Sequence, residues 1–133
     1  MAEKIQFELV SPAKLLVSEA VDMVVVPGSE GDFGALAMHA PMITTVRPGV
    51  IDVHDGGKVG KRIFVAGGFA EVNEERVTVL AEEAIPVTEI TADLVSSRLQ
   101  EAREAVADAK SDAEKAAAAQ RMLVATALEA AAR

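Results

Sequence analysis

Polar and apolar residues alternate at the start of the chain. Ile5, Phe7 and Leu9 are apolar, and the positions between them are polar or charged. Successive side chains of a β-strand point to opposite faces, so a period of two indicates a strand with one buried face. The first residues therefore predict a half-buried strand.

Short apolar runs recur over the first two thirds of the chain, separated by turn residues. They are Val21–Val26, Val50–His54, Ile63–Val65, Ala70–Val72 and Val77–Leu80. All nine glycines and all five prolines precede residue 88. Many short strands with no helical pattern between them are typical of all-β domains. We predict that residues 1–88 form an antiparallel β-sandwich or flattened barrel of about ten short strands.

After residue 88 the apolar positions follow a helical period. The first stripe consists of Val95, Leu99, Ala102, Val106 and Ala109. Its steps of three and four residues place it on one face of a helix, and Thr91 precedes it as an N-cap. We predict a helix over about residues 91–109.

A second helix is predicted over about residues 112–131. The run Ser111-Asp112-Ala113-Glu114 fits a capping box. Its apolar side consists of Ala113, Ala117, Val124, Ala127, Leu128 and Ala131. Residues 89–133 would then fold as an antiparallel hairpin. Alanine buries little area, so the hairpin is expected to be mobile, or to lean on the β domain or on a partner. A plain helical cap is the simpler alternative.

The amino-acid composition of the chain excludes several classes of function. The chain has 133 residues and a formal net charge of −8, which repels phosphate backbones. Four phenylalanines, without tryptophan or tyrosine, leave little for bases to stack on, so we expect no nucleic-acid partner. The absence of cysteine excludes disulfides and cysteine-based zinc sites. Two histidines are too few for most histidine-rich metal sites, and we expect no metal and no cofactor.

No pattern in the sequence indicates catalysis. The segment from Gly56 to Arg62 has the wrong spacing for a phosphate-binding loop, and Gly28, Gly31 and Gly34 do not match the dinucleotide fingerprint. A triad is spatial, so a small hydrolase with a cryptic site remains an alternative. We predict no catalytic residues.

The start of the chain lacks a basic region followed by an apolar one, as a secretory signal would have. Apolar stretches fall far short of the roughly 18 to 20 residues needed to span a bilayer. We expect no direct insertion into a membrane and attachment only through a partner.

Three blocks of sequence resemble one known family. Val26 to Leu36, continued through His39-Ala40-Pro41 to Val50, is similar to the signature of the epsilon subunits of F-type ATP synthases. Phe64 to Val72 and Val77 to Ala84 resemble the family's later blocks. The blocks occur in the family's order and are followed by two helices of the expected length.

The resemblance implies contacts with the c-ring and the gamma subunit. The residues at or near them would be Glu30, Asp32, His39, Met42 and Ile43. Gly31 and Gly34 tolerate a positive φ, so we expect Glu30 and Asp32 to project from a tight exposed loop. The alternative is that the glycines and prolines only make turns and that His39 packs locally.

The family's role is mechanical. The β domain joins gamma to the c-ring, on the cytoplasmic side of the bacterial inner membrane, and has no catalytic residues. In the family the hairpin can extend along gamma, where basic residues meet an acidic segment of the catalytic beta subunits. Here, eight acidic and six basic residues from Glu89 onward give the hairpin a net charge of −2. We therefore expect at most weak regulation of ATP hydrolysis.

Some bacterial members bind ATP through an I-D-x-x-R-A stretch. The corresponding region here contains Asp93 and Arg98, at a different spacing. They are weak candidates, and we predict no tight ATP binding. A nucleotide-sensing module whose hairpin closes on ATP remains the alternative function.

Overall fold

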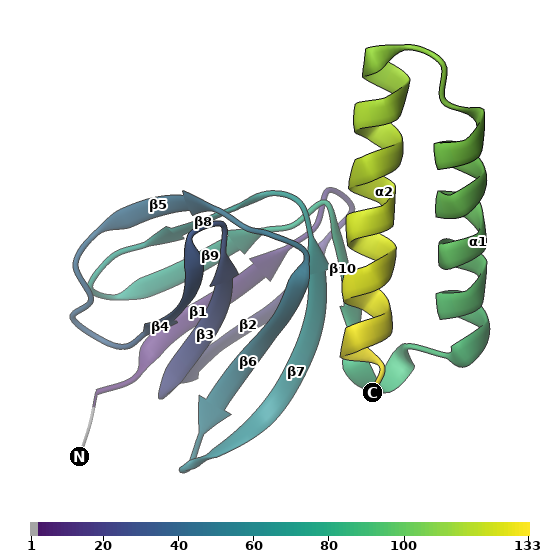
Figure 1. Cartoon of the computed structure of the whole chain (residues 1–133). Helices are drawn as coiled ribbons and strands as arrows, with labels where there is room; N and C mark the ends of the chain where they lie inside the picture. Colours follow the sequence, from purple (N-terminus) through teal and green to yellow (C-terminus); the bar gives the residue numbers. More distant parts are fainter. Residues whose placement is uncertain (1–2) are drawn as a thin grey trace. The chain divides into compact units, whose positions relative to one another are not determined.

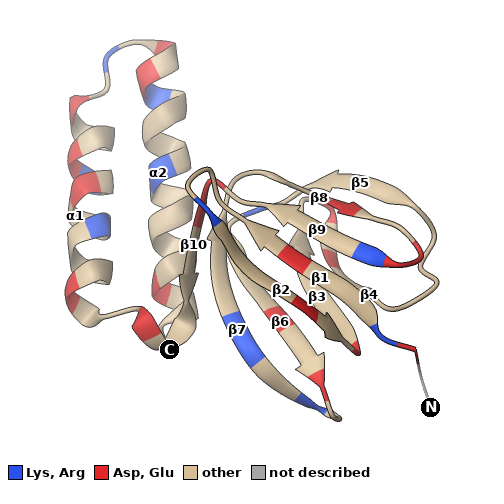
Figure 2. Ribbon diagram, turned by 180° about the vertical axis from the view of Figure 1, so that it is seen from behind, with Lys and Arg blue, Asp and Glu red and all other residues tan. Residues whose placement is uncertain are grey.

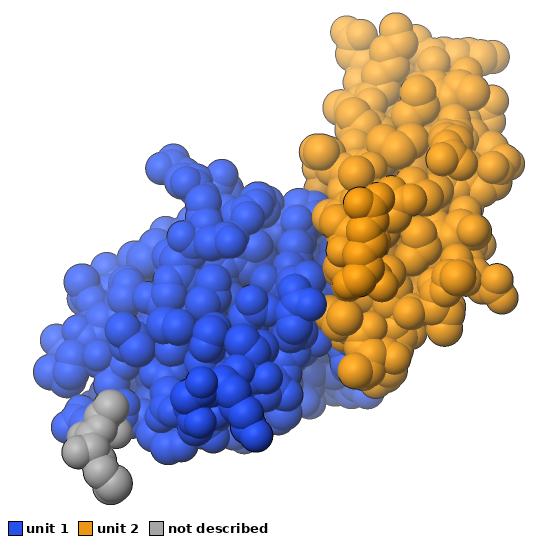
Figure 3. All heavy atoms as spheres, turned by 60° about the horizontal axis from the view of Figure 1, so that its bottom comes forward, with its two compact units in different colours: residues 1–86 blue, residues 87–133 orange. Residues whose placement is uncertain are grey.

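A computed structural model describes residues 3–133. The chain divides into two compact units, Met1–Pro86 and Val87–Arg133, which Figure 3 shows in different colours. Charged residues of both signs lie along the helices and on the strands (Figure 2).

The described part of the first unit contains ten strands in two five-stranded sheets (Figure 1). They are β1 (Ile5–Val10), β2 (Leu15–Val21), β3 (Met23–Gly28), β4 (Gly31–Ala35), β5 (Met42–Thr45), β6 (Gly49–Asp55), β7 (Lys58–Ala66), β8 (Phe69–Val72), β9 (Arg76–Leu80) and β10 (Glu83–Pro86). The strand order is β2-β1-β9-β8-β5 in the first sheet and β10-β7-β6-β3-β4 in the second. The predicted β-sandwich is confirmed.

The core lies between the sheets and is made mainly of β-branched side chains. Ile5, Phe7 and Leu9 are fully buried, and Ile51 and Val79 lie in the same apolar cluster. The alternation at the start of the chain therefore marked a strand with one face in the core, as predicted.

One strand pair departs from the antiparallel expectation, because β1 runs parallel to β9. The two strands are far apart in sequence, so no hairpin turn constrains their direction.

The run Val21–Val26 was expected to be one strand, and that was wrong. Val21 ends β2 and Met23 begins β3, in different sheets. The backbone N–H of Asp22 donates to the His54 carbonyl (3.0 Å), and its carboxylate accepts from the Gly56 N–H (2.8 Å). These bonds fix Asp22 at the point where the chain changes sheets.

The second unit contains a short 3₁₀ turn (Val87–Glu89) and two helices, α1 (Ala92–Asp108) and α2 (Asp112–Ala131). The Thr91 hydroxyl accepts from the Leu94 N–H (3.1 Å), as the N-cap prediction requires. Ser111 and Glu114 form the expected capping box. Both helices therefore start where the sequence indicated.

The predicted helix faces were partly wrong. Val106 is half exposed, and Ala113 and Ala117 are exposed, whereas Ala118 and Ala125 are buried. Four consecutive alanines precede Gln120, and they contain no polar side chain that would show which of them faces inward. The capping signal therefore predicted where the helix begins, but it did not show which face of the helix is buried.

Candidate interaction surface

The β3–β4 hairpin carries the first predicted contact residue at its tip. Gly28 and Gly31 are opposite each other across the strand pair, with Ser29 and Glu30 between them, and Glu30 is exposed. A Cβ on Gly28 would lie 2.8 Å from the Gly31 carbonyl oxygen, and Gly31 has a φ of +131°. The turn therefore needs glycine on both sides, and it presents the Glu30 carboxylate to solvent.

Asp32 does not project from a loop, which corrects the prediction. It lies on β4, as does Gly34, which does not adopt a positive φ. The missing Cβ of Gly34 instead leaves room for the Met23 sulfur, which lies 3.1 Å from where that Cβ would be. The glycine is therefore explained by close side-chain packing.

Arg47 neutralises Asp32 within the chain. Its guanidinium forms an ion pair with the Asp32 carboxylate and donates to the Gly28 carbonyl (2.5 Å). Its backbone N–H donates to the Pro27 carbonyl (2.9 Å). An exposed ion pair adds little stability by itself. Here the same Arg47 side chain also hydrogen-bonds to the Gly28 backbone carbonyl, so it ties the β3–β4 turn to the segment before β6.

His39 has local partners, as in the alternative that the sequence left open. Its ring lies beside the Phe33 ring (centroids 6.4 Å apart, 45° between planes). Its Nδ1 lies 2.6 Å from the Ala40 carbonyl oxygen. Packing therefore fixes His39 in the loop between β4 and β5.

Met42 and Ile43 point to opposite faces of the edge strand β5. Met42 packs against the core, whereas Ile43 is 71% exposed. Of the two, only Ile43 offers a large apolar side chain to a partner.

The sequence missed an apolar row that crosses the outer face of the first sheet. Val10 pairs with Leu15 on β2 and with Leu80 on β9, and Leu80 pairs with Phe69 on β8. Leu15, Leu80 and Phe69 are all exposed. A hollow of about 490 Å³ is lined in part by Val10, Phe69 and Leu80. Strand register brings these residues together, and register could not be deduced from isolated runs.

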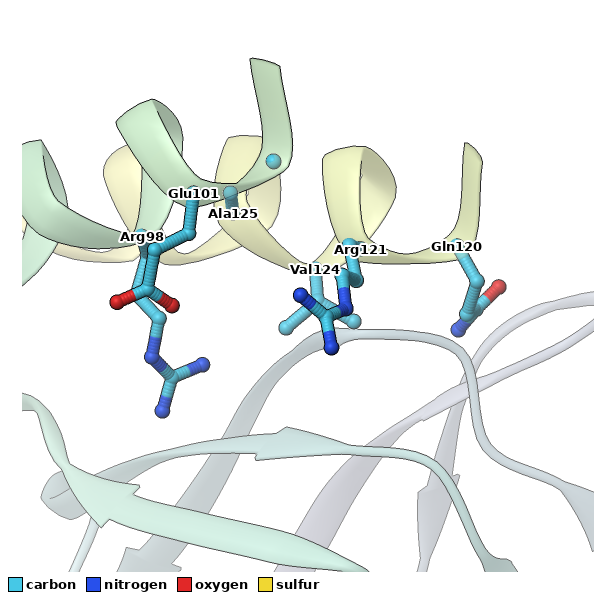
Figure 4. A pocket seen from close by; sticks show the side chains of 7 residues that line it. Arg98, Glu101, Gln120, Arg121, Val124 and Ala125 are labelled. Atoms are coloured by element: carbon cyan, nitrogen blue, oxygen red, sulfur yellow. The ribbon is translucent and has the colours of Figure 1, made fainter. Parts of the chain in front are cut away.

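In the hairpin, a hollow of about 270 Å³ lies between α1 and α2. Its lining residues are Arg98, Glu101, Ala102, Gln120, Arg121, Val124 and Ala125 (Figure 4). Of the two predicted nucleotide candidates, Arg98 lines the hollow and Asp93, in the first turn of α1, does not. Arg121 supplies a second guanidinium, and Glu101 adds a carboxylate that opposes anion binding.

Within residues 3–133, no cluster of three or more histidine, cysteine or acidic side chains is arranged to hold a metal ion. None of the described helices has the length and apolar character required to cross a membrane.

Comparison with known proteins assigns the family. Residues 4–87 match the family described as "ATP synthase, Delta/Epsilon chain, beta-sandwich domain". The chain is 76% identical to the ATP synthase epsilon chain of Paramagnetospirillum magneticum, over 98% of both chains. It is 59% identical to that of Rhodospirillum rubrum, again over 98% of both.

Solved structures of ATP synthases contain chains of the same fold. The chain superposes with a TM-score of 0.82 and 28% identity on a chain of the Euglena gracilis mitochondrial ATP synthase, covering 100% of this chain and 84% of that one. A chain of the Tetrahymena thermophila mitochondrial ATP synthase shares the fold (TM-score 0.75, 15% identity, 99% and 98% covered). By its β-sandwich domain and its full-length similarity to epsilon chains, this chain belongs to the delta/epsilon family of ATP synthase subunits.

Proposed function

We propose that the chain is the non-catalytic rotor subunit of an F-type ATP synthase that joins the gamma subunit to the c-ring. It transmits torque from proton-driven ring rotation to the catalytic subunits. The observation that carries the proposal is the 76% identity to an epsilon chain over 98% of both chains. The subunit is then held peripherally on the cytoplasmic side of the bacterial inner membrane, through the synthase.

Two surfaces of the β unit fit the two partners. The Glu30 turn is polar, exposed and braced by Arg47, which suits the polar loops of a c-ring. The row from Leu15 to Phe69 is apolar and exposed, which suits the obligate interface with gamma. Asp32 acts through its ion pair with Arg47. His39 is held beside Phe33, and Met42 packs on the core under the strand that carries Ile43.

Reconstitution tests the proposal. Membrane vesicles holding a synthase stripped of this subunit should regain proton-driven ATP synthesis when the wild-type chain is added. A double variant, Glu30→Lys with His39→Ala, should bind the stripped enzyme more weakly. Asp108→Lys, the same charge reversal on α1, is the control. No recovery with the wild-type chain would contradict the proposal.

The hairpin has at most a weak regulatory role in this proposal. Its net charge of −2 opposes attraction to an acidic segment of the catalytic beta subunits. Removing residues 89–133 should leave coupled ATP synthesis intact and change the latency of ATP hydrolysis little. A large rise in hydrolysis by the truncated enzyme would show that the hairpin inhibits.

Nucleotide sensing is the second candidate, because Arg98, Gln120 and Arg121 meet around one hollow in the hairpin. Asp93 lies outside this hollow and Glu101 lines it, so we expect no tight ATP binding. Titration calorimetry of the full chain with ATP measures this. Low-micromolar affinity that is lost in Arg121→Ala would favour the sensing function.

A further inference from the structure

The β3–β4 turn lies at the edge of the second sheet, yet it is bonded to backbone outside that sheet. In the described chain β4 is the last strand of its sheet, next to β3. The Ser29 N–H donates to the Thr45 carbonyl (2.9 Å) at the end of β5, and Gly28 forms an isolated antiparallel bridge with Val46. Because β5 belongs to the first sheet, the turn that carries Glu30 is fastened to both sheets.

The segment between β5 and β6 is itself anchored where the chain passes from the first sheet to the second. The Val46 side chain is buried in the core, and its N–H donates to the Gly68 carbonyl (3.1 Å). Gly68 lies between β7 and β8, where the chain returns to the first sheet. The two crossings are therefore hydrogen-bonded to each other beside the β3–β4 turn. A closely packed support of this kind resists deformation.

Arg47 adds a side-chain link between this support and the hairpin. Its guanidinium donates to the Gly28 carbonyl (2.5 Å) on β3 and forms an ion pair with Asp32 on β4. One guanidinium thus holds both strands of the hairpin. Its donors point in fixed directions, so it can serve both oxygens at once, whereas a lysine ammonium lacks this fork.

We propose that Arg47 is a positioning residue for torque transfer, which keeps the Glu30 turn in a fixed direction under the force of a turning ring. The inference rests on the proposed function. A hairpin tip at a sheet edge has few tertiary contacts and opens locally at a low cost in free energy. Without the guanidinium, the turn yields before the force reaches the rest of the subunit. Arg47 therefore acts on coupling and not on binding to gamma, because the apolar row lies on other strands.

Amide hydrogen exchange of the full-length free chain measures the bracing of the turn. Arg47→Ala should accelerate exchange of the Ser29 N–H about tenfold, because its bond to the Thr45 carbonyl opens more often. Arg47→Lys should accelerate it less. Arg62→Ala is the matched control, since it removes an ion pair of similar exposure, with Asp52, between two neighbouring strands of one sheet. The control should leave Ser29 exchange unchanged, and unchanged exchange in Arg47→Ala would overturn the inference.

Reconstituted membrane vesicles measure the effect on coupling. A stripped synthase that receives the Arg47→Ala chain should bind it with wild-type affinity and hydrolyse ATP, but should lose part of its proton-driven ATP synthesis. Arg47→Lys should restore some of the loss, and Arg62→Ala should couple fully. Full coupling by Arg47→Ala, or a loss explained by weaker binding, would overturn the inference and leave the proposed function standing. Failure of the wild-type chain to restore synthesis would overturn both.

Discussion

The two units of the chain are stabilised in different ways. The β unit buries large side chains such as Phe7 and Ile51, and its turns depend on particular glycines. The hairpin buries mostly alanine, Ala102 and Ala118 among them, and depends on capping side chains at its helix starts. Apolar burial contributes in proportion to area, so each alanine contributes less than the β-branched residues of the sandwich.

This difference fits the proposed roles of the two units, which are torque transmission by the β unit and at most weak regulation by the hairpin. A surface that transmits torque must keep its shape, and close-packed cores resist deformation. A helix whose contacts are mostly alanine loses little when it separates from a neighbour. We infer that destabilising substitutions in the β unit disturb its whole interaction surface, whereas those in the hairpin affect only the hairpin.

The largest expected effect is that of Gly68→Ala. With a φ of +98°, a Cβ at this position would lie 1.8 Å from the Leu80 carbonyl oxygen, and backbone cannot move aside as a side chain can. We expect a loss of more than about 4 kcal/mol in the free energy of unfolding, or no folded protein. Gly60→Ala is the control, since its Cβ would meet nothing within 4 Å. Urea unfolding of both variants measures the contrast, and similar stabilities would refute it.

Phe7→Ala should come next. Phe7 is fully buried, and removing its ring leaves a cavity in the sandwich core. The expected cost is about 3–5 kcal/mol. Ala118→Gly in the hairpin should cost only about 1 kcal/mol, through helix propensity. Comparing the two by denaturant unfolding tests whether the units differ as proposed. A larger cost for Ala118→Gly would reverse the comparison.

Local signals in the sequence predicted local structure well. Alternation located β1, and Thr91, Ser111 and Glu114 located the helix starts. The sequence did not indicate β2, where Ser18 and Glu19 interrupt the apolar pattern. Nor did it indicate β4, whose glycines were interpreted as a loop.

Features that depend on long-range pairing could not be predicted. The parallel partnership of β1 with β9 joins strands about seventy residues apart in sequence. The ion pair of Asp32 with Arg47 and the apolar row across the first sheet arise from register. The left-handed conformation of Met38 had no local signal either, because methionine rarely adopts it. The candidate contact residues were therefore placed by resemblance, and their surroundings came from the fold.

Ser111→Ala is expected to have a smaller effect on stability than Gly68→Ala or Phe7→Ala. The Ser111 hydroxyl accepts from the Glu114 N–H (3.1 Å), and its loss leaves an unpaired donor at the start of α2. Caps of this kind contribute about 1 kcal/mol. Far-UV circular dichroism should show reduced helicity of the hairpin at high temperature. Ser97→Ala, within α1, is the control and should not reduce helicity. Equal effects of the two substitutions would argue against the capping box.

The smallest effect concerns the charge on Glu114. Its carboxylate accepts the N–H groups of Ser111 (2.9 Å) and Lys110 (3.1 Å), which hold its pKa below the ordinary value of 4.5. Because the folded pKa is the lower one, the stabilisation is fully present above the unfolded pKa. It is lost as the pH falls through the folded pKa. Glu114→Gln keeps an acceptor oxygen without the charge, so its deficit in hairpin stability should be constant near neutral pH and shrink in acid below pH 4.5. Thermal unfolding across this pH range, followed by helical dichroism, measures the deficit. A deficit independent of pH would mean that the hydrogen bonds, and not the charge, hold the start of α2.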